Sequence, residues 1–265
     1  MLPCELAVDQ KIFICKRTKI DEKMNSCKIN KLIEILKPYT ERVEKPREFS
    51  LDINNLWKWL VEQICCRASS KSIDLLAKSG EKGRFHSELS LEKMPLSYQE
   101  NLEVLNRFKA TRFRPSASKT ILENYRRSFG KKEFRFFSLF REKLPRKELT
   151  EERIEAERRV RKNLIKEHAF VWVLRIKNEW RIYDWKMKPV SDWLKDIGFA
   201  VTLMAFDTNV KKILKELGIK ATDKNYEDVE DMFIKQVCPE LKIFPSQIDK
   251  ILYRKSDQIV ELLKS

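Results

Sequence analysis

Apolar residues recur at every third or fourth position through most of the chain, and this spacing predicts helices. The stretch FSLDINNLWKWLVEQICC, for example, brings Leu56, Trp57, Leu60 and Ile64 onto one helical side. Helical spacing also marks residues 29–39, 69–80, 98–109, 114–130, 132–144, 150–168, 190–198, 207–218, 226–238 and 245–265. The pattern therefore predicts a mainly α fold.

Several residues indicate where these helices begin and end. Pro38 should stop the helix predicted at 29–39, because proline lacks an N–H group and clashes with the preceding turn. Ser70 or Ser72 is a suitable cap for the next short helix, and Gly80 is a suitable end. The breaks between the predicted helices are short.

Residues 169–185, AFVWVLRIKNEWRIYDW, interrupt the helical pattern. Two runs rich in β-branched and aromatic residues flank the segment KNE, and this arrangement is typical of a β-hairpin. A buried helix followed by an irregular loop fits the same residues. Periodicity does not decide between the two, so a small β-hairpin stays a candidate here.

The excess of positive charge indicates what kind of partner the protein binds. The formal net charge is +15, and residues 101–150 alone hold fourteen Lys and Arg against five Glu. Cations replace the counterions of phosphates, so this excess favours binding to nucleic acid. Aromatic rings lie among these cations and could stack on bases. We expect most of the rings to lie in the core instead, because Phe134, Phe137 and Phe140 follow helical spacing.

Cysteine and histidine offer no metal site and no cofactor site. None of the six cysteines forms a CxxC pair, and the adjacent Cys65 and Cys66 suit burial in a helix within a reducing compartment. We expect His86 and His168 to be structural. The sequence has no apolar run of membrane-spanning length and begins without a signal-peptide pattern, so we expect a cytoplasmic protein.

Lys188 and Asp207 stand nineteen positions apart in a segment that reads KMKPVSDWLKDIGFAVTLMAFDTNVKKILKELG. Each residue has a plain structural role. Asp207 precedes the apolar positions of a helix and suits an N-cap, whereas Lys188 suits a surface charge. The alternative is chemical: a lysine amine is a nucleophile, and a nearby carboxylate can stabilise positive charge on its substrate.

The surrounding residues resemble a known family. The run WLKDIGFAVTLMAFDTNVKKILKELGI resembles the catalytic segment of helix-hairpin-helix DNA glycosylases, in which a lysine ends the hairpin and an aspartate begins a later helix. Lys188 and Asp207 match these two positions. The chain is most similar to the archaeal 8-oxoguanine DNA glycosylase/AP lyases of the second type. Supporting stretches are QICCRASS at 63–70, RFRPSASKTILENYR at 112–126 and IDKILYRKSDQIVELLKS at 248–265.

One departure concerns the hairpin. The family hairpin reads Gly-hydrophobic-Gly before the lysine, so that the backbone can approach a phosphate. The corresponding residues here are Asp184, Trp185 and Lys186. Lys186 is therefore a candidate phosphate contact, and it is also the alternative to Lys188 as the reacting lysine.

The resemblance implies a two-lobed helical fold with a cleft between the lobes. Residues 1–48 would pack on the helical core, residues 49–168 would form a basic helical lobe, and residues 169–265 would form the catalytic lobe. The activity implied is base excision repair: excision of 8-oxoguanine from double-stranded DNA, followed by strand cleavage. We expect a monomer that needs no metal or other cofactor and lies in the cytoplasm with the nucleoid.

The resemblance also implies a mechanism and further site residues. Lys188 would attack the sugar of a flipped nucleotide, with its pKa lowered by nearby cations, and Asp207 would stabilise the positive charge that develops. Those cations are Lys186, Lys195 and Lys211. The expected DNA contacts are Lys186, Arg67, Arg112, Arg114 and Lys119, and the expected base-pocket residue is Lys264.

Two alternatives stay open. The enzyme could act on another lesion, such as hypoxanthine or an oxidised pyrimidine. A protein that binds DNA without catalysis on the same scaffold would also fit the altered hairpin.

Overall fold

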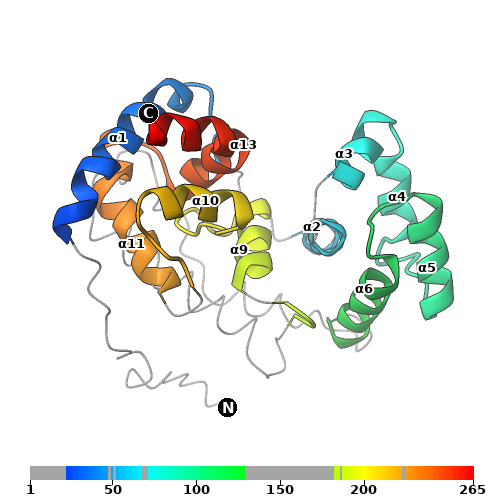
Figure 1. The fold of residues 1–265 in the computed structure, drawn as a ribbon. Helices are drawn as coiled ribbons and strands as arrows, with labels where there is room; N and C mark the ends of the chain where they lie inside the picture. The colour runs from blue at the N-terminus through cyan, green and yellow to red at the C-terminus, as the bar shows by residue number, and fades with distance from the viewer. Residues whose placement is uncertain are drawn as a thin grey trace, which may run out of the picture.

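The structure is a computed structural model that describes residues 22–46, 49, 52–66, 71–128, 182–185, 187–222 and 225–265. All regular secondary structure in these residues is helical, with no strand among them, which confirms the predicted mainly α fold. The helices form two groups, which Figure 1 shows side by side.

The first group holds the helices between residues 53 and 128. They are α2 (Ile53–Cys65), α3 (Lys71–Lys78), α4 (Lys82–Glu88), α5 (Tyr98–Arg107) and α6 (Arg114–Ser128). Helix α6 packs against both α5 and α2. Ser97 begins α5 with a capping box: its hydroxyl accepts a hydrogen bond from the Glu100 N–H, and the Glu100 carboxylate accepts one from the Ser97 N–H.

The second group joins the first described helix to the last five. They are α1 (Glu22–Thr40), α9 (Met187–Asp196), α10 (Thr208–Glu216), α11 (Tyr226–Gln236), α12 (Cys238–Leu241) and α13 (Pro245–Lys264). Helix α13 packs against α1, α10 and α11, and Figure 1 shows it beside α1 and above α10. The N-terminal helix therefore packs on the C-terminal part of the chain.

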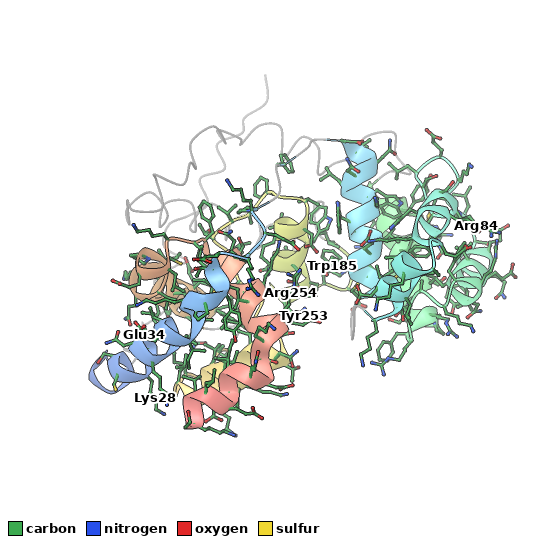
Figure 2. The ribbon with its side chains drawn as sticks, turned by 90° about the horizontal axis from the view of Figure 1, so that it is seen from above. Lys28, Glu34, Arg84, Trp185, Tyr253 and Arg254 are labelled. Atoms are coloured by element: carbon green, nitrogen blue, oxygen red, sulfur yellow. The ribbon has the colours of Figure 1, made fainter. Side chains whose placement is uncertain are left out.

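Helices α2 and α9 pack together and link the two groups. The indole N–H of Trp193 on α9 donates a hydrogen bond to the Leu56 carbonyl of α2, with 3.2 Å between nitrogen and oxygen. The Trp185 ring meets the Trp193 ring edge-on, with 6.0 Å between centroids. Figure 2 shows Trp185 between the two groups, and both tryptophans are buried. One apolar core thus continues from one group into the other.

Most predicted helix limits in the described residues lie close to the observed ones, but the helix predicted at 29–39 starts earlier than expected and is not stopped by Pro38. Helix α1 begins at Glu22 and continues through Pro38 to Thr40. Proline lacks the N–H for one helical hydrogen bond, and only two residues of the helix follow it. The buried Leu32 and Leu36 give this helix an apolar side for packing against its neighbours. By contrast, Gly80 does lie just past the end of α3, with a φ of +75° that favours glycine.

The candidate β-hairpin at 169–185 lies mostly outside the described residues. Its last four residues, 182–185, form a turn without strand structure. The predicted helices at 132–144 and 150–168 also lie outside the described part. Among the aromatic residues of the basic segment, Phe108 is buried as predicted, whereas Phe113 is 51% exposed.

The described cysteines are free thiols, and Cys65 is buried in α2 as predicted. His86, which we expected to be structural, pairs with a carboxylate: its Nε2 lies 2.8 Å from Oε1 of the buried Glu62. His168 lies outside the described residues. The helices among the described residues are too short or too polar to cross a membrane.

Because Trp193 lies in the apolar core that connects the two groups of helices, we predict that its removal destabilises the protein. Trp193→Ala should lower the free energy of unfolding by about 3–5 kcal/mol, because it removes a buried indole and leaves a cavity. Urea unfolding followed by circular dichroism measures this loss. Leu75→Ala, at a side chain that is 65% exposed, is the control and should change stability little. An equally small effect of Trp193→Ala would contradict a core that is continuous between the groups.

Candidate functional site

Asp207 lies directly before α10 and caps it. Its backbone is extended, with φ −76° and ψ −175°, and its Oδ1 accepts a hydrogen bond from the Val210 N–H at 2.8 Å. The predicted N-cap role is therefore confirmed. The side chain is partly exposed, and the apolar Val210, Ile213 and Leu214 bury the helix beneath it.

Lys188 lies in the first turn of α9, directly before Pro189. Proline fits there because the first N–H groups of a helix have no helical acceptor. The Lys188 ammonium donates a hydrogen bond of 2.6 Å to Oδ2 of Asp192, one turn along the same helix. The Lys188 side chain is 45% exposed, so part of it reaches solvent beside this carboxylate.

The turn that leads into α9 is anchored on α6. Oδ1 of the buried Asn124 accepts a hydrogen bond from the Tyr183 N–H at 2.7 Å, and its Nδ2 lies 3.4 Å from the Tyr183 carbonyl oxygen. Asp184 follows with a φ of +63°, in the left-handed region that favours glycine. Trp185 then enters the core. Residues from both groups thus determine where α9 starts.

A chain of alternating charges extends inward from Lys188. Asp192 lies between two cations, because its Oδ1 is 3.1 Å from Nζ of Lys195. The Lys195 ammonium also forms an ion pair with Asp249 of α13. Lys195 and Asp249 are buried, and Oδ1 of Asp249 accepts a hydrogen bond from the Ala205 N–H at 3.1 Å. This buried charge chain, Lys188–Asp192–Lys195–Asp249, ties α9 to α13.

The connection between α9 and α10, residues 197–206, is held by side chains of α11 and α13. Three consecutive backbone N–H groups each meet a side-chain oxygen. Met204 donates to Glu230 at 2.7 Å, Ala205 donates to Asp249, and Phe206 donates to the Tyr226 hydroxyl at 2.8 Å. The Tyr226 hydroxyl in turn donates to the Met204 carbonyl at 2.9 Å. All of these groups are buried, so the backbone that leads to Asp207 has a defined path.

Lys188 and Asp207 lie near each other. Burial alone would lower the pKa of Lys188, but the charge and the hydrogen bond of Asp192 raise it above its ordinary value. Lys195 opposes this rise, and the Asp207 carboxylate adds to it. Asp207 is therefore close enough for its charge to act on the Lys188 amine.

The expected lowering of the Lys188 pKa by neighbouring cations is wrong for the free protein. Lys195 does act in the expected direction, but the adjacent Asp192 carboxylate outweighs it. Lys195 is also paired with two carboxylates, which reduces its effect on its surroundings. Lys211 is exposed, and Lys186 lies outside the described residues.

Burial and the neighbouring charges together set the direction in which the pKa of each buried group shifts. Asp192 lies between two lysines, and their attraction outweighs burial and lowers its pKa. Burial alone would lower the pKa of Lys195, but Asp249 and Asp192 raise it. Burial raises the pKa of Asp249 to about 6, with the negative charge of Asp192 adding to the rise and Lys195 opposing it. Asp249 is thus the member of the chain that titrates nearest to neutral pH.

The other predicted site residues lie away from this cluster or outside the described residues. Arg112, Arg114 and Lys119 gather at the start of α6, and Arg114 lies about 15 Å along the helix from Asn124. Lys264 ends α13, about 20 Å along the helix from Asp249, with its Nζ 3.8 Å from Oε1 of Glu216. Arg67 lies outside the described residues, and α2 ends beside Asp196, where Gln63 donates a 2.5 Å hydrogen bond to that carboxylate.

Sequence reasoning missed the residues that support Lys188 and Asp207. Asp192 has a visible signal, because a carboxylate four residues after a lysine on a helix can pair with it. Asp249 stands among Ile248, Ile251 and Leu252, and a carboxylate at such a position is a sign of a buried partner. The described residues hold no cluster of His, Cys, Asp and Glu that could bind a metal ion.

The chain matches no protein-family model, no curated protein and no solved structure.

The raised pKa of Asp249 predicts a pH-dependent stability. The folded value is about 6, above the usual value of about 3.9 for an unfolded chain, so the folded protein binds this proton more tightly. The resulting stabilisation is complete below the unfolded value and is lost as pH rises through about 6. Asp249 should therefore make the protein more stable at pH 5 than at pH 7, by on the order of 1 kcal/mol.

Urea unfolding of the wild type and of Asp249→Asn at both pH values measures this increment. The variant should lack it, because an amide does not titrate. An identical pH dependence in the two proteins would show that Asp249 does not titrate in this range.

Proposed function

We propose that the protein is a DNA glycosylase with AP lyase activity, which excises an oxidised purine, 8-oxoguanine, from double-stranded DNA. The observation that carries the proposal is the placement of Lys188 and Asp207 at the starts of two successive helices, close enough for their charges to interact. An amine and a carboxylate in this arrangement are the two groups that Schiff-base excision requires.

In the proposed reaction the damaged nucleotide is flipped out of the duplex, because its sugar is unreachable within the stack. The neutral Lys188 amine attacks C1′, the bond between C1′ and the base breaks, and the base leaves with the electron pair of that bond and takes up a proton. Asp207 stabilises the positive charge that develops on the sugar. The nitrogen loses a proton as the aminosugar ring opens to a Schiff base. Elimination then removes a proton from C2′ and expels the 3′ phosphate as the leaving group, which cleaves the strand.

The turn before α9 supports the hairpin part of the proposal. Asp184 stands where the family has its first hairpin glycine, and its φ of +63° is one that glycine adopts readily. The backbone conformation can therefore be kept although the glycine is replaced. The arrangement of the helices in two groups, joined by α2 and α9, fits the two lobes that the resemblance implies.

The charge distribution supports DNA as the partner. The excess of Lys and Arg continues into the start of α6, where Arg112 and Lys119 are exposed beside the half-exposed ring of Phe113. Cations with an aromatic side chain suit a phosphate backbone and a base. Binding as a monomer in the cytoplasm, without metal or cofactor, belongs to the same proposal.

One observation favours a second function, DNA binding without catalysis. Asp192 pairs with the Lys188 ammonium and raises its pKa, whereas a nucleophilic lysine must lose its proton. A protein in which this pair never opens would bind DNA and leave the strand intact.

Borohydride trapping separates the two functions. The wild type, incubated with duplexes that each carry one lesion and then reduced, should form a covalent adduct, and Lys188→Gln should form none because it lacks the amine. Lys186→Gln is the matched control and should still form the adduct. Binding without an adduct for any lesion would favour the non-catalytic protein. An adduct lost in Lys186→Gln but kept in Lys188→Gln would move the nucleophile to Lys186.

A panel of lesions in the same assay tests the substrate. We expect the largest adduct yield with 8-oxoguanine. A larger yield with hypoxanthine or an oxidised pyrimidine would keep the enzyme class and change the lesion.

Asp207→Asn separates catalysis from helix capping. Asparagine caps a helix about as well as aspartate, so folding and DNA binding should stay near normal. Base excision should fall by at least about a hundredfold, because the charge that stabilises the transition state is gone. Single-turnover excision and thermal unfolding measure the two effects. Unchanged excision, or a loss of stability that accounts for the whole loss of activity, would leave Asp207 with the capping role alone.

A further inference from the structure

We propose that Asp192 is a positioning residue for Lys188, held in place by the buried pair of Lys195 and Asp249. This inference rests on the proposed function of Lys188 as nucleophile. In the free protein, Asp192 orients the Lys188 amine and keeps it protonated. The amine loses its proton and becomes reactive when the Asp192 carboxylate no longer stabilises the positive charge of the ammonium.

The geometry assigns two cations to the Asp192 carboxylate. Its Oδ2 accepts from Lys188 at 2.6 Å, and its Oδ1 lies 3.1 Å from Nζ of Lys195. Lys188 is 45% exposed, whereas Asp192 is 19% and Lys195 is 8% exposed. The exposure thus decreases from Lys188 through Asp192 to Lys195, and Lys188 is the member of the chain that reaches solvent most.

Stability alone gives a weak reason for such a chain. Removing charges from water is costly, and apolar residues of similar volume commonly stabilise a protein as well as a buried ion pair does. The charge chain has a more specific effect, because it fixes the position of one partly exposed charge, the Lys188 ammonium. Lys195 pairs with Asp192 on α9 and with Asp249 on α13, so a rotation of Asp192 away from Lys188 would also disturb its contact with Lys195.

The charged groups that face Lys188 come from several elements. From α9 these are Asp192 and Lys195, and from the start of α10 Asp207. Asp249 of α13 is linked through Lys195, and Tyr226 and Glu230 of α11 lie behind it around the 197–206 connection. Asp192 is the nearest counter-charge and the one that hydrogen-bonds to the amine. Its replacement should therefore change the titration of Lys188 most.

Asp192→Asn keeps a hydrogen-bond acceptor beside Lys188 and removes the charge. Burial and Lys195 both disfavour the ammonium, so without this charge the Lys188 amine should lose its proton at a pH lower by roughly one unit or more. Asp192→Ala removes the charge and the acceptor, so it should produce the same shift and also lower the maximal rate. Asp192→Glu keeps the charge and should restore much of the wild-type behaviour.

The direct test is titration of the free protein. Lysines are methylated reductively with ¹³C, the Lys188 signal is assigned by its absence from Lys188→Gln, and its pKa is read from NMR spectra. The pKa should fall in Asp192→Asn and stay in place in Asp257→Asn. The latter removes the carboxylate of an exposed pair with Lys212 and is the matched control. An unchanged Lys188 pKa in folded Asp192→Asn would overturn the inference.

A second variant keeps the test open if Asp192→Asn fails to fold. Asp249→Asn leaves Asp192 in place but removes the other carboxylate that pairs with Lys195. The positive charge of Lys195 is then neutralised less and interacts more strongly with Asp192. The Lys188 pKa should fall in this variant too, by a smaller amount. No shift would overturn the inference.

The pH profile of borohydride trapping connects the titration to the reaction. Its acidic limb should move to lower pH in Asp192→Asn by the same amount as the NMR value, a shift that a purely structural role would not produce. An unmoved limb, with an adduct that still depends on Lys188, would overturn the inference and leave the proposed function intact. If the wild type forms no adduct, the proposed function fails, and the NMR titration still decides the role of Asp192.

Discussion

The ammonium of Lys195, buried between the carboxylates of Asp192 and Asp249, is the interaction on which the site depends. It joins α9 to α13, and Asp249 also accepts the Ala205 N–H of the segment that leads to Asp207. A buried charge without its partner is strongly destabilising, so these groups must stay together when the protein folds. One cation thus connects the helix that carries the amine with the backbone that carries the carboxylate.

Backbone hydrogen bonds extend this control to Asp207. The connection between α9 and α10 crosses the interior, where unpaired N–H groups would cost free energy, and Glu230 and Tyr226 pair with the N–H groups on either side of Ala205. Asp207 follows at once and is held by its own hydrogen bond to α10. A reactive pair needs such fixed supports, because small displacements greatly reduce the rate of a reaction between bound groups.

The sequence was sufficient for the helical fold, most helix limits and the cap at Asp207, because these depend on neighbouring residues. It was insufficient at Pro38, where tertiary packing carries α1 past a residue that usually ends a helix. Asp249 pairs with Lys195 from 54 residues away, and Asn124 pairs with the Tyr183 backbone from 59 residues away. Local periodicity holds no information on such distant pairs. The predicted direction of the Lys188 pKa was wrong for a different reason: the prediction counted the nearby cations and left out Asp192, which lies only four residues further along the same helix.

The central claim is that the amine of Lys188 bonds to the sugar of a damaged nucleotide. The most direct measurement is to reduce the wild-type complex with borohydride, digest the protein and the DNA, and locate the remaining sugar adduct by mass spectrometry. The account predicts a modified lysine at position 188 in a peptide that contains PVSDWLK. A modification at Lys186 or at any other lysine, or an unmodified protein after reduction with lesion-bearing DNA, would contradict it.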